Sequence, residues 1–307
     1  MDRDRLAGSG ADRGAPPRAG DSAAPPAGEN AAAPAGENAV PPAGENAVPP
    51  VDITVARQAR IYDFLLGGKD NFAVDREAAA QAIEAFPGLA AWARHNRAFL
   101  ARAVRYLVTE AGVRQFLDVG TGLPTANNTH EVAQGIAPES RVVYVDNDPV
   151  VLVHAQALLY STREGATAYI SADLRDPETI LEQAAATLDF SQPVALMLLA
   201  ILHVIPDSDD PWGIVGRLMA GLPPGSFLVM SHPARDIHAE AIAEMTKRFN
   251  QRMGGVMANG RTRDEVARFF TGLELVEPGI VSTPRWRPDP GIEQPADPAY
   301  AAVARKP

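Results

Sequence analysis

Five apolar segments alternating with helical stretches are the feature that most constrains the fold of this chain. The apolar segments cover 115–119, 141–145, 167–171, 193–202 and 226–231. Helical spacing follows them at 128–135, 149–161, 177–187, 211–221 and 235–252. Apolar strands that alternate with helices indicate a parallel sheet whose two faces are both covered by helices. We therefore predict a doubly wound α/β domain.

The sequence on both sides of this alternation predicts further elements. Helical spacing covers 54–66, 76–85 and 90–111, before the first strand. Asp75 is the expected N-cap of the second of these helices. After a helix at 262–271, two strands near 274–282 and 299–305 are separated by a Pro-rich segment without a helix. This pair predicts an antiparallel hairpin at one edge of a mostly parallel, seven-stranded sheet.

The first fifty residues differ from the rest in composition. Pro-Ala-Gly-Glu-Asn occurs there three times, at 26–30, 34–38 and 42–46. Such a segment buries too little apolar surface to offset its chain entropy, so we expect a disordered tail over 1–50. The expected organisation is this tail, an N-terminal helical cap over 51–112 and the α/β domain over 113–307.

Composition also narrows the partners and the compartment. The 307 residues carry a net charge of −10 and include no cysteine. An acidic chain disfavours nucleic acid, whose affinity comes mainly from Lys and Arg on phosphates, and we interpret Arg94, Arg97, Arg102 and Arg105 as a solvated helix face. The longest apolar run has nine residues, at 194–202, against the ~20 of a membrane helix. Without that span or a secretory signal, we expect no membrane association and a cytoplasmic location.

The first strand ends in Asp118-Val119-Gly120-Thr121-Gly122, the motif that points most directly to a ligand. Ligands of open parallel sheets bind beyond the carboxyl ends of the strands, and the glycines permit close approach of the backbone. The third glycine of G-x-G-x-x-G is missing, and the Asp118 carboxylate would repel a pyrophosphate but attract an ammonium group. S-adenosylmethionine carries an ammonium group and a sulfonium, so this turn favours that cofactor over a dinucleotide.

Acidic residues also follow the next two strands. Asp146 lies 28 residues after Asp118, where its carboxylate can accept both hydroxyls of a ribose, and Asn147 is its neighbour. The alternative is a plain turn, with Asp148 capping the next helix. Asp173 and the adjacent Leu174 follow the third strand, where a carboxylate and a backbone N–H can read an adenine edge. The alternative for Asp173 is a loop residue that caps a turn.

Three segments resemble a family of bacterial S-adenosyl methyltransferases common in high-GC species. They are 59–75 (ARIYDFLLGGKDNFAVD), 115–134 (QFLDVGTGLPTANNTHEVAQ) and 142–149 (VVYVDNDP). The resemblance covers about 54–305 and implies a class I, Rossmann-like fold with an added N-terminal helical part. It also implies that S-adenosylmethionine contacts the residues that match the family pattern, which are Asp118, Gly120, Asp146, Asp173 and Leu174. The resemblance supplies no substrate.

Two places outside these strand ends carry further candidates. The loop from Gly67 to Phe72 can close over the cofactor through Lys69 and Asn71, with Tyr62 or Phe72 against the sulfonium. The alternative is a helix connection with a glycine stop. His203 follows the fourth apolar segment, where class I enzymes often place catalytic groups, and the ordinary pKa of histidine suits a general base. The alternative is a structural histidine. The six histidines lack metal-ligand spacing, so no metal site is expected.

These features predict a methyltransferase that uses S-adenosylmethionine and acts on a small-molecule acceptor. One alternative is a regulatory protein that binds S-adenosylmethionine or S-adenosylhomocysteine without turnover. The other is an NAD-dependent oxidoreductase, which the missing third glycine and the position of Asp118 disfavour. The sequence predicts neither the acceptor nor the oligomeric state.

Overall fold

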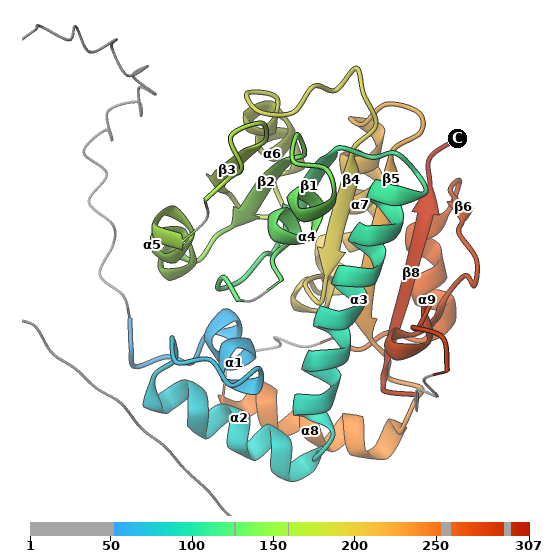
Figure 1. Cartoon of the computed structure of the whole chain (residues 1–307). Coiled ribbons are helices and arrows are strands. Elements are labelled where there is room, and N and C mark those ends of the chain that lie inside the picture. The colour runs from blue at the N-terminus through green and yellow to red at the C-terminus, as the bar shows by residue number, and fades with distance from the viewer. Residues whose placement is uncertain (1–51, 126, 159, 253–258, 292–295) are drawn as a thin grey trace, which may run out of the picture. The chain divides into compact units, whose positions relative to one another are not determined.

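The computed structural model describes residues 52–125, 127–158, 160–252, 259–291 and 296–307 (Figure 1). The tail predicted over 1–50 lies outside these residues. The described residues before the sheet form α1 (Gln58–Leu65), α2 (Ala73–Ala85) and α3 (Leu89–Thr109). Among the described residues, no helix combines the length and the apolar composition that crossing a membrane requires.

Strands and helices then alternate as predicted. The strands of the sheet are β1 (Gln115–Val119), β2 (Arg141–Asp146), β3 (Ala166–Ser171), β4 (Ala195–Leu199), β5 (Phe227–Pro233), β6 (Glu274–Leu275), β7 (Val281–Ser282) and β8 (Ala299–Arg305). The helices between them are α4 (Thr129–Ile136), α5 (Pro149–Leu158), α6 (Pro177–Ala184), α7 (Pro211–Ala220), α8 (Ala239–Arg252) and α9 (Arg263–Ala267). Short 3₁₀ turns include η1 (Leu202–Val204), η3 (Arg268–Phe270) and η4 (Thr283–Arg285).

The strand order is β3-β2-β1-β4-β5-β8-β6, with β7 also paired to β8. The strands β1 to β5 are parallel, and β8 runs antiparallel to β5 from Phe227↔Arg305 to Pro233↔Ala299. This confirms the predicted doubly wound, mostly parallel sheet with an antiparallel edge. The predicted strand at 274–282 is instead two short strands, because Pro278 has no N–H to donate and Gly279 turns the chain with a φ of +80°.

Helices cover both faces of the sheet. On one face, Phe99 and Leu107 of α3 and Ala133 of α4 pack against strand residues such as Phe116 and Val142. On the other, α6, α7 and the turn after α9 supply Ile180, Leu218 and Phe269 to a second core. Burial of both faces explains why β1, β2 and β4 are mainly apolar and show no regular alternation of apolar and polar residues. It leaves the carboxyl ends of the strands as the place for polar groups.

A third group of helices lies across those carboxyl ends (Figure 1). We call α1, α2 and α8 the helical cap. Their buried residues form a separate cluster with the start of α3, and Met245 of α8 packs against it. The N-terminal helices were expected in such a cap, but the contribution of α8, from a distant part of the sequence, was not.

Asp75 joins two helices of the cap. The prediction that it is the N-cap of a helix beginning at residue 76 is wrong, because α2 begins at Ala73. Its carboxylate accepts hydrogen bonds from the backbone N–H groups of Arg57 and Phe72, both at 2.9 Å. It also pairs with the Arg60 guanidinium at 2.9 Å, and both side chains are buried. This pair fixes α1, which forms one wall of the site described next.

Candidate functional site

A cavity of about 550 Å³ lies between α1 of the cap and the ends of β1, β2 and β4. The turn from Gly120 to Gly122 lines it, together with residues of α1, α3, the start of α5 and the segment that follows β4. Most polar groups in the wall follow a strand or face it from a helix: Arg57, Gln58, Tyr62, Asn96, Arg97, Asp118, Asp146, Asn147, Asp148 and Arg175. We call this the larger cavity. It lies where open α/β sheets bind their ligands.

The glycine turn has the close backbone approach that the sequence predicts. Gly120 and Gly122 have φ values of +76° and +65°, in the left-handed region that favours glycine. A Cβ atom on Gly120 would lie 2.3 Å from Cγ1 of Ile201. The Gly120 N–H donates to the carbonyl of Val145 at 2.8 Å, so the turn is held against the end of β2.

Asp146 binds the glycine turn through its carboxylate. One oxygen accepts the N–H of Gly122 at 2.9 Å, and the other accepts the N–H of Asp148 at 3.0 Å. Burial raises the pKa of Asp146 above its ordinary value, and these backbone bonds oppose that rise. Each carboxylate oxygen keeps a second lone pair, so Asp146 can still accept hydrogen bonds from a ligand in the cavity. Asp148 also accepts the N–H of Val150 at 2.9 Å and caps α5, the alternative kept open for it.

Asp118 is buried beneath the turn. Its Oδ2 accepts a hydrogen bond from Oγ1 of Thr129 at 2.6 Å. Burial raises the pKa of Asp118 to about 6, with a smaller contribution from Asp146, while Thr129 and Arg97 act in the opposite direction. Two carboxylates, the buried Asp118 and the half-buried Asp146, thus line one cavity, and a cation that approaches them offsets the cost of their desolvation. These residues fit a ligand with a ribose and an ammonium group, such as S-adenosylmethionine.

Most of the cofactor residues proposed from the sequence come together here. Seven line the larger cavity: Tyr62, Asp118, Gly120, Thr121, Gly122, Asp146 and Asn147. Lys69, Asn71, Asp173 and Leu174 do not line it. The amide of Asn71 instead donates to Asp63 and Gly68, and Lys69 is exposed.

Asp173 and Leu174 have other contacts. Asp173 pairs with Arg175 at 3.2 Å and accepts a hydrogen bond from the Asn147 amide, also at 3.2 Å. The side chain of Leu174 is buried in the apolar core. Asp173 therefore meets the cavity through its neighbours Asn147 and Arg175, both of which line it.

The cavity also contains residues that sequence reasoning missed. Arg97 belongs to the arginine cluster interpreted as a solvated face, yet it lines the cavity and donates to the carbonyl of Asn127 at 2.9 Å. Arg102 of the same cluster donates to the carbonyls of Trp286 and Thr283 at 2.8 and 2.9 Å. The solvated-face interpretation is therefore wrong for these two residues. Arg94 and Arg105, each about one helical turn away from one of these residues, are exposed. Helical periodicity alone did not distinguish the exposed arginines from the two that contact the rest of the protein.

A second cavity of about 80 Å³ lies inside the helical cap. It shares Gln58 and Tyr62 with the larger cavity, and we call it the smaller cavity. The Tyr62 hydroxyl donates to the carbonyl of Ala93 at 3.1 Å and accepts from the Asn96 amide at 2.9 Å. Burial raises the pKa of Tyr62, so the phenol is uncharged where the two cavities meet.

His203 lines the smaller cavity from η1, just after the end of β4. The side-chain amide of Gln58 contacts its Nε2. Its Nδ1 is buried and finds no hydrogen-bond partner among the described residues. Burial, together with the charge of Arg261, lowers the pKa of His203 to about 4, so the ring is neutral at pH 7. The Gln58 amide can donate to Nε2 or, rotated, accept from it, and both arrangements leave Nδ1 for another molecule.

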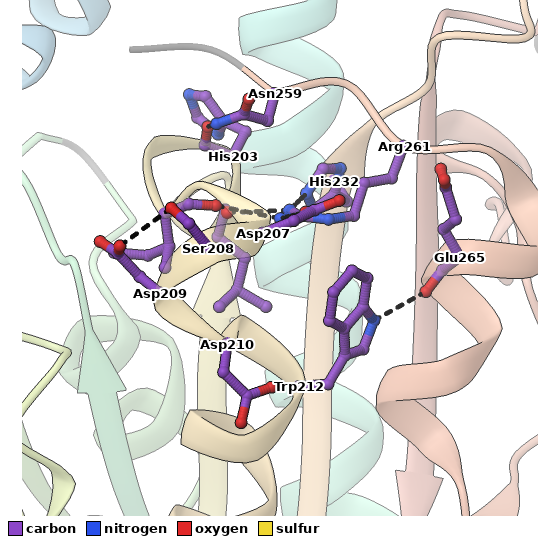
Figure 2. Close-up of polar contacts among 12 residues, drawn as sticks. His203, Asp207, Ser208, Asp209, Asp210, Trp212, His232, Asn259, Arg261 and Glu265 are labelled. Carbon is purple, nitrogen blue, oxygen red and sulfur yellow. Dashed lines mark hydrogen bonds and ion pairs between the residues drawn. The ribbon is translucent and has the colours of Figure 1, made fainter. Parts of the chain in front are cut away.

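Arg261 anchors the segment that carries His203 (Figure 2). Its guanidinium donates to the carbonyls of Leu202 and Ile205, both at 3.0 Å, and contacts Nε2 of His232 at 2.7 Å. It also pairs with Asp207 at 2.7 Å. The guanidinium is buried. Burial of His232, together with the nearby charge of Arg261, holds the pKa of His232 well below its ordinary value. This network fixes η1 and keeps both histidines neutral.

Comparison with known proteins agrees with this geometry. The sequence model of the S-adenosyl methyltransferase family matches residues 44–307. A DUF574 family protein from Streptomyces avermitilis is 48% identical with a TM-score of 0.80, over 83% of this chain and 99% of its own. A candidate methyltransferase from Thermobifida fusca is 43% identical with a TM-score of 0.75, over 83% and 96%. No curated protein matches the chain. The chain therefore belongs to the S-adenosyl methyltransferase family and is a class I methyltransferase that uses S-adenosylmethionine.

Proposed function

We propose that S-adenosylmethionine binds in the larger cavity and that its methyl group passes to a small-molecule acceptor. The observation that carries this proposal is the pair of carboxylates at the glycine turn, the buried Asp118 and the half-buried Asp146, which both line the larger cavity. Asp146 accepts the ribose hydroxyls through its remaining lone pairs, and Asp118 faces the ammonium group. The backbone from Gly120 to Gly122 lies against the amino-acid part of the cofactor.

The adenine end belongs at the start of α5 in this proposal. Pro149 and Val150 give the larger cavity an apolar wall there, and Asn147 lies beside them. Asp173 orients the Asn147 amide by accepting its hydrogen bond, so it acts as a positioning residue and not as a direct ligand. Leu174 supports the same loop from the core.

Methyl transfer from a sulfonium requires mainly that the protein align the acceptor with the methyl group. The bound sulfonium supplies a methyl group that is already activated for in-line displacement. The protein must hold the nucleophile of the acceptor in line with that methyl group and exclude water, which are effects of proximity and desolvation. Arg60, Asp75 and the cap helices hold α1 over the cavity and serve both needs.

The size of the acceptor follows from the cap. Helix α1 lies over the carboxyl ends of the strands, and Gln58 and Tyr62 line both cavities. A nucleophile that reaches the larger cavity from this side passes between these two half-buried side chains. A small molecule fits this path better than a folded macromolecule.

Calorimetric titration of the full chain tests the cofactor site. Saturable binding of S-adenosylmethionine and S-adenosylhomocysteine, with none for NAD, is the expected result. Asp146→Asn weakens the binding of S-adenosylmethionine and of S-adenosylhomocysteine by at least about tenfold, because it replaces a charge-assisted acceptor. Asp176→Asn, at the exposed N-cap of α6, is the matched control and binds as the wild type does. Binding of NAD alone would reject the proposal.

Turnover separates an enzyme from a cofactor-binding regulator. Incubation of the chain with S-adenosylmethionine and a small-molecule fraction of a bacterial extract is expected to release S-adenosylhomocysteine. The Asp146→Asn variant releases less at the same cofactor concentration. Tight cofactor binding without release in any fraction would favour the regulatory alternative.

A further inference from the structure

The smaller cavity adjoins the proposed cofactor site but has a different character. Its walls are mainly apolar side chains of the helical cap and α3, among them Leu65, Leu89, Trp92, Ile242 and Met245. None of the described residues that line it carries a charge at pH 7, since His203 is neutral. A carboxylate or ammonium group placed there would be buried without an opposite charge, which is costly. The cavity therefore suits an uncharged molecule.

Its volume sets the size of that molecule. The cavity measures about 80 Å³, several times the ~10–15 Å³ that a single water requires on the same measure. Walls made of leucine, isoleucine and tryptophan favour an apolar body over a cluster of waters. A single ring or a short branched chain matches these dimensions.

Three buried polar atoms on this cavity have no hydrogen-bond partner among the described residues. They are Oε1 of Gln58, Nε1 of Trp92 and Nδ1 of His203. Buried polar atoms are nearly always paired, so each of these points to a missing partner. The indole N–H of Trp92 can only donate. When the Gln58 amide donates to Nε2 of His203, the Gln58 oxygen remains as an acceptor; when the amide is rotated and accepts from Nε2, Nδ1 of His203 remains as the acceptor instead. One hydroxyl group satisfies both kinds, because its oxygen accepts and its hydrogen donates.

We propose that the smaller cavity holds the methyl acceptor, and that this acceptor is a compact, uncharged alcohol or phenol with an apolar body. The inference rests on the proposed function, because it needs the methyl donor in the larger cavity. Gln58 and Tyr62 line both cavities, so the hydroxyl lies where the two meet. The apolar body then fills the cap side.

The transfer balances with the groups present. The hydroxyl oxygen forms the new O–CH₃ bond, and the methyl–sulfur bond breaks with its electron pair moving to sulfur. The hydroxyl proton passes to Nδ1 of His203 and then to solvent. A weakly basic imidazole is sufficient, because the oxygen becomes strongly acidic as the new bond forms. Gln58 accepts the hydrogen on Nε2 of His203 in this arrangement, which keeps Nδ1 free of a proton.

Three related probes test the ligand class on the wild-type protein. Calorimetry of the protein saturated with S-adenosylhomocysteine compares 4-ethylphenol with 4-hydroxyphenylacetate, which adds a charge, and with ethylbenzene, which lacks the hydroxyl. We expect saturable binding of 4-ethylphenol and at least about tenfold weaker binding of the other two. No saturable binding of 4-ethylphenol, or equal binding of the charged probe, would overturn the inference.

A matched pair of variants tests the place. Thr246→Trp puts a large side chain into the smaller cavity from α8, and Thr246 does not line the larger one. This substitution is expected to weaken the binding of 4-ethylphenol at least about tenfold, while S-adenosylhomocysteine binds as before. Leu275→Trp, on an exposed position of β6, is the control and changes neither. Unchanged binding of 4-ethylphenol by Thr246→Trp would place the ligand elsewhere and overturn the inference.

The outcomes separate the two proposals. If the wild-type protein does not bind S-adenosylhomocysteine, the proposed function is rejected. Intact S-adenosylhomocysteine binding without the expected pattern of phenol binding would reject only the acceptor inference.

Discussion

The hydroxyl of Thr129 donates a 2.6 Å hydrogen bond to the carboxylate of Asp118 beneath the glycine turn. This bond joins the start of α4 to the end of β1 and fixes the orientation of the carboxylate. It offsets only part of the desolvation of Asp118, whose pKa still rises to about 6 because burial is the larger effect. The charged carboxylate of Asp118 therefore destabilises the free protein, and a bound cation offsets this cost. The same carboxylate lowers the stability of the free protein and raises its affinity for a cationic ligand.

Asp118→Asn is expected to show this opposition. The folded protein binds a proton on Asp118 up to about pH 6, against 3.8 for the unfolded chain, so the charged carboxylate costs up to about 3 kcal/mol of unfolding free energy at pH 7.5. The variant removes that cost and is roughly 1–3 kcal/mol more stable without ligand, while its affinity for S-adenosylhomocysteine falls.

Urea unfolding and calorimetry measure the two effects. The stability gain should shrink as the pH falls from 7.5 toward 4, because the wild-type carboxyl then takes up its proton. A variant that is less stable at pH 7.5 and binds the ligand as well as the wild type would contradict this account.

Gly120→Ala is expected to damage the turn and the cavity together. The new Cβ atom would lie 2.3 Å from Cγ1 of Ile201, on a backbone with a φ of +76°. The loss of unfolding free energy is about 1–3 kcal/mol, and cofactor affinity falls because Ile201 lines the larger cavity. Gly122→Ala is the control for backbone strain alone, since its φ is +65° and its Cβ would have nothing nearer than 4.0 Å. Equal effects of the two substitutions would show that the contact with Ile201 is unimportant.

Arg261→Met is expected to loosen the segment that carries His203. The substitution leaves the carbonyls of Leu202 and Ile205 without their donor, at a cost of about 2–4 kcal/mol. It also removes a positive charge that lowers the pKa of His203 and His232, so both pKa values rise. Urea unfolding checks the first effect and NMR titration of the histidine ring protons checks the second. Arg235→Met, at a half-exposed ion pair with Glu265, changes stability by less than about 1 kcal/mol.

His203 is expected to make the protein sensitive to acid. Its pKa is about 4 in the folded protein, against the ordinary histidine value of 6.5 in an unfolded chain. The unfolded chain therefore binds more protons between these values, and stability falls as the pH drops from 6.5 toward 4. His203→Gln removes this component, so the stability of the variant relative to the wild type improves as the pH falls. A pH-independent difference in urea midpoint would show that His203 titrates normally.

Local patterns were sufficient for the strands that form the sheet. The segments that became β1, β2 and β4 are buried on both faces, and mainly apolar runs predict such strands directly. The run at 193–202 extended past the real end of β4, because Ala200 takes a φ of +51° and the chain turns into η1. Apolar composition cannot report such a change in backbone direction.

The site was predictable where it lies at a strand end. Asp118 and Asp146 lie in the last two residues of their strands and Gly120 directly follows β1, and parallel strands bring their ends to one edge. The missed parts come from tertiary packing. Gln58 reaches His203 across 145 residues of sequence, and α8 closes the smaller cavity from a distant segment. No periodicity within either segment encodes these contacts.

A crystal structure of the complex with S-adenosylhomocysteine would show whether the larger cavity is the cofactor site. We expect the ligand in the larger cavity, with the ribose hydroxyls within hydrogen-bond distance of Asp146, the amino-acid end above Gly120 and the sulfur facing Tyr62 and Gln58. A ligand bound outside this cavity, or inside it with the ribose away from Asp146, would contradict the account.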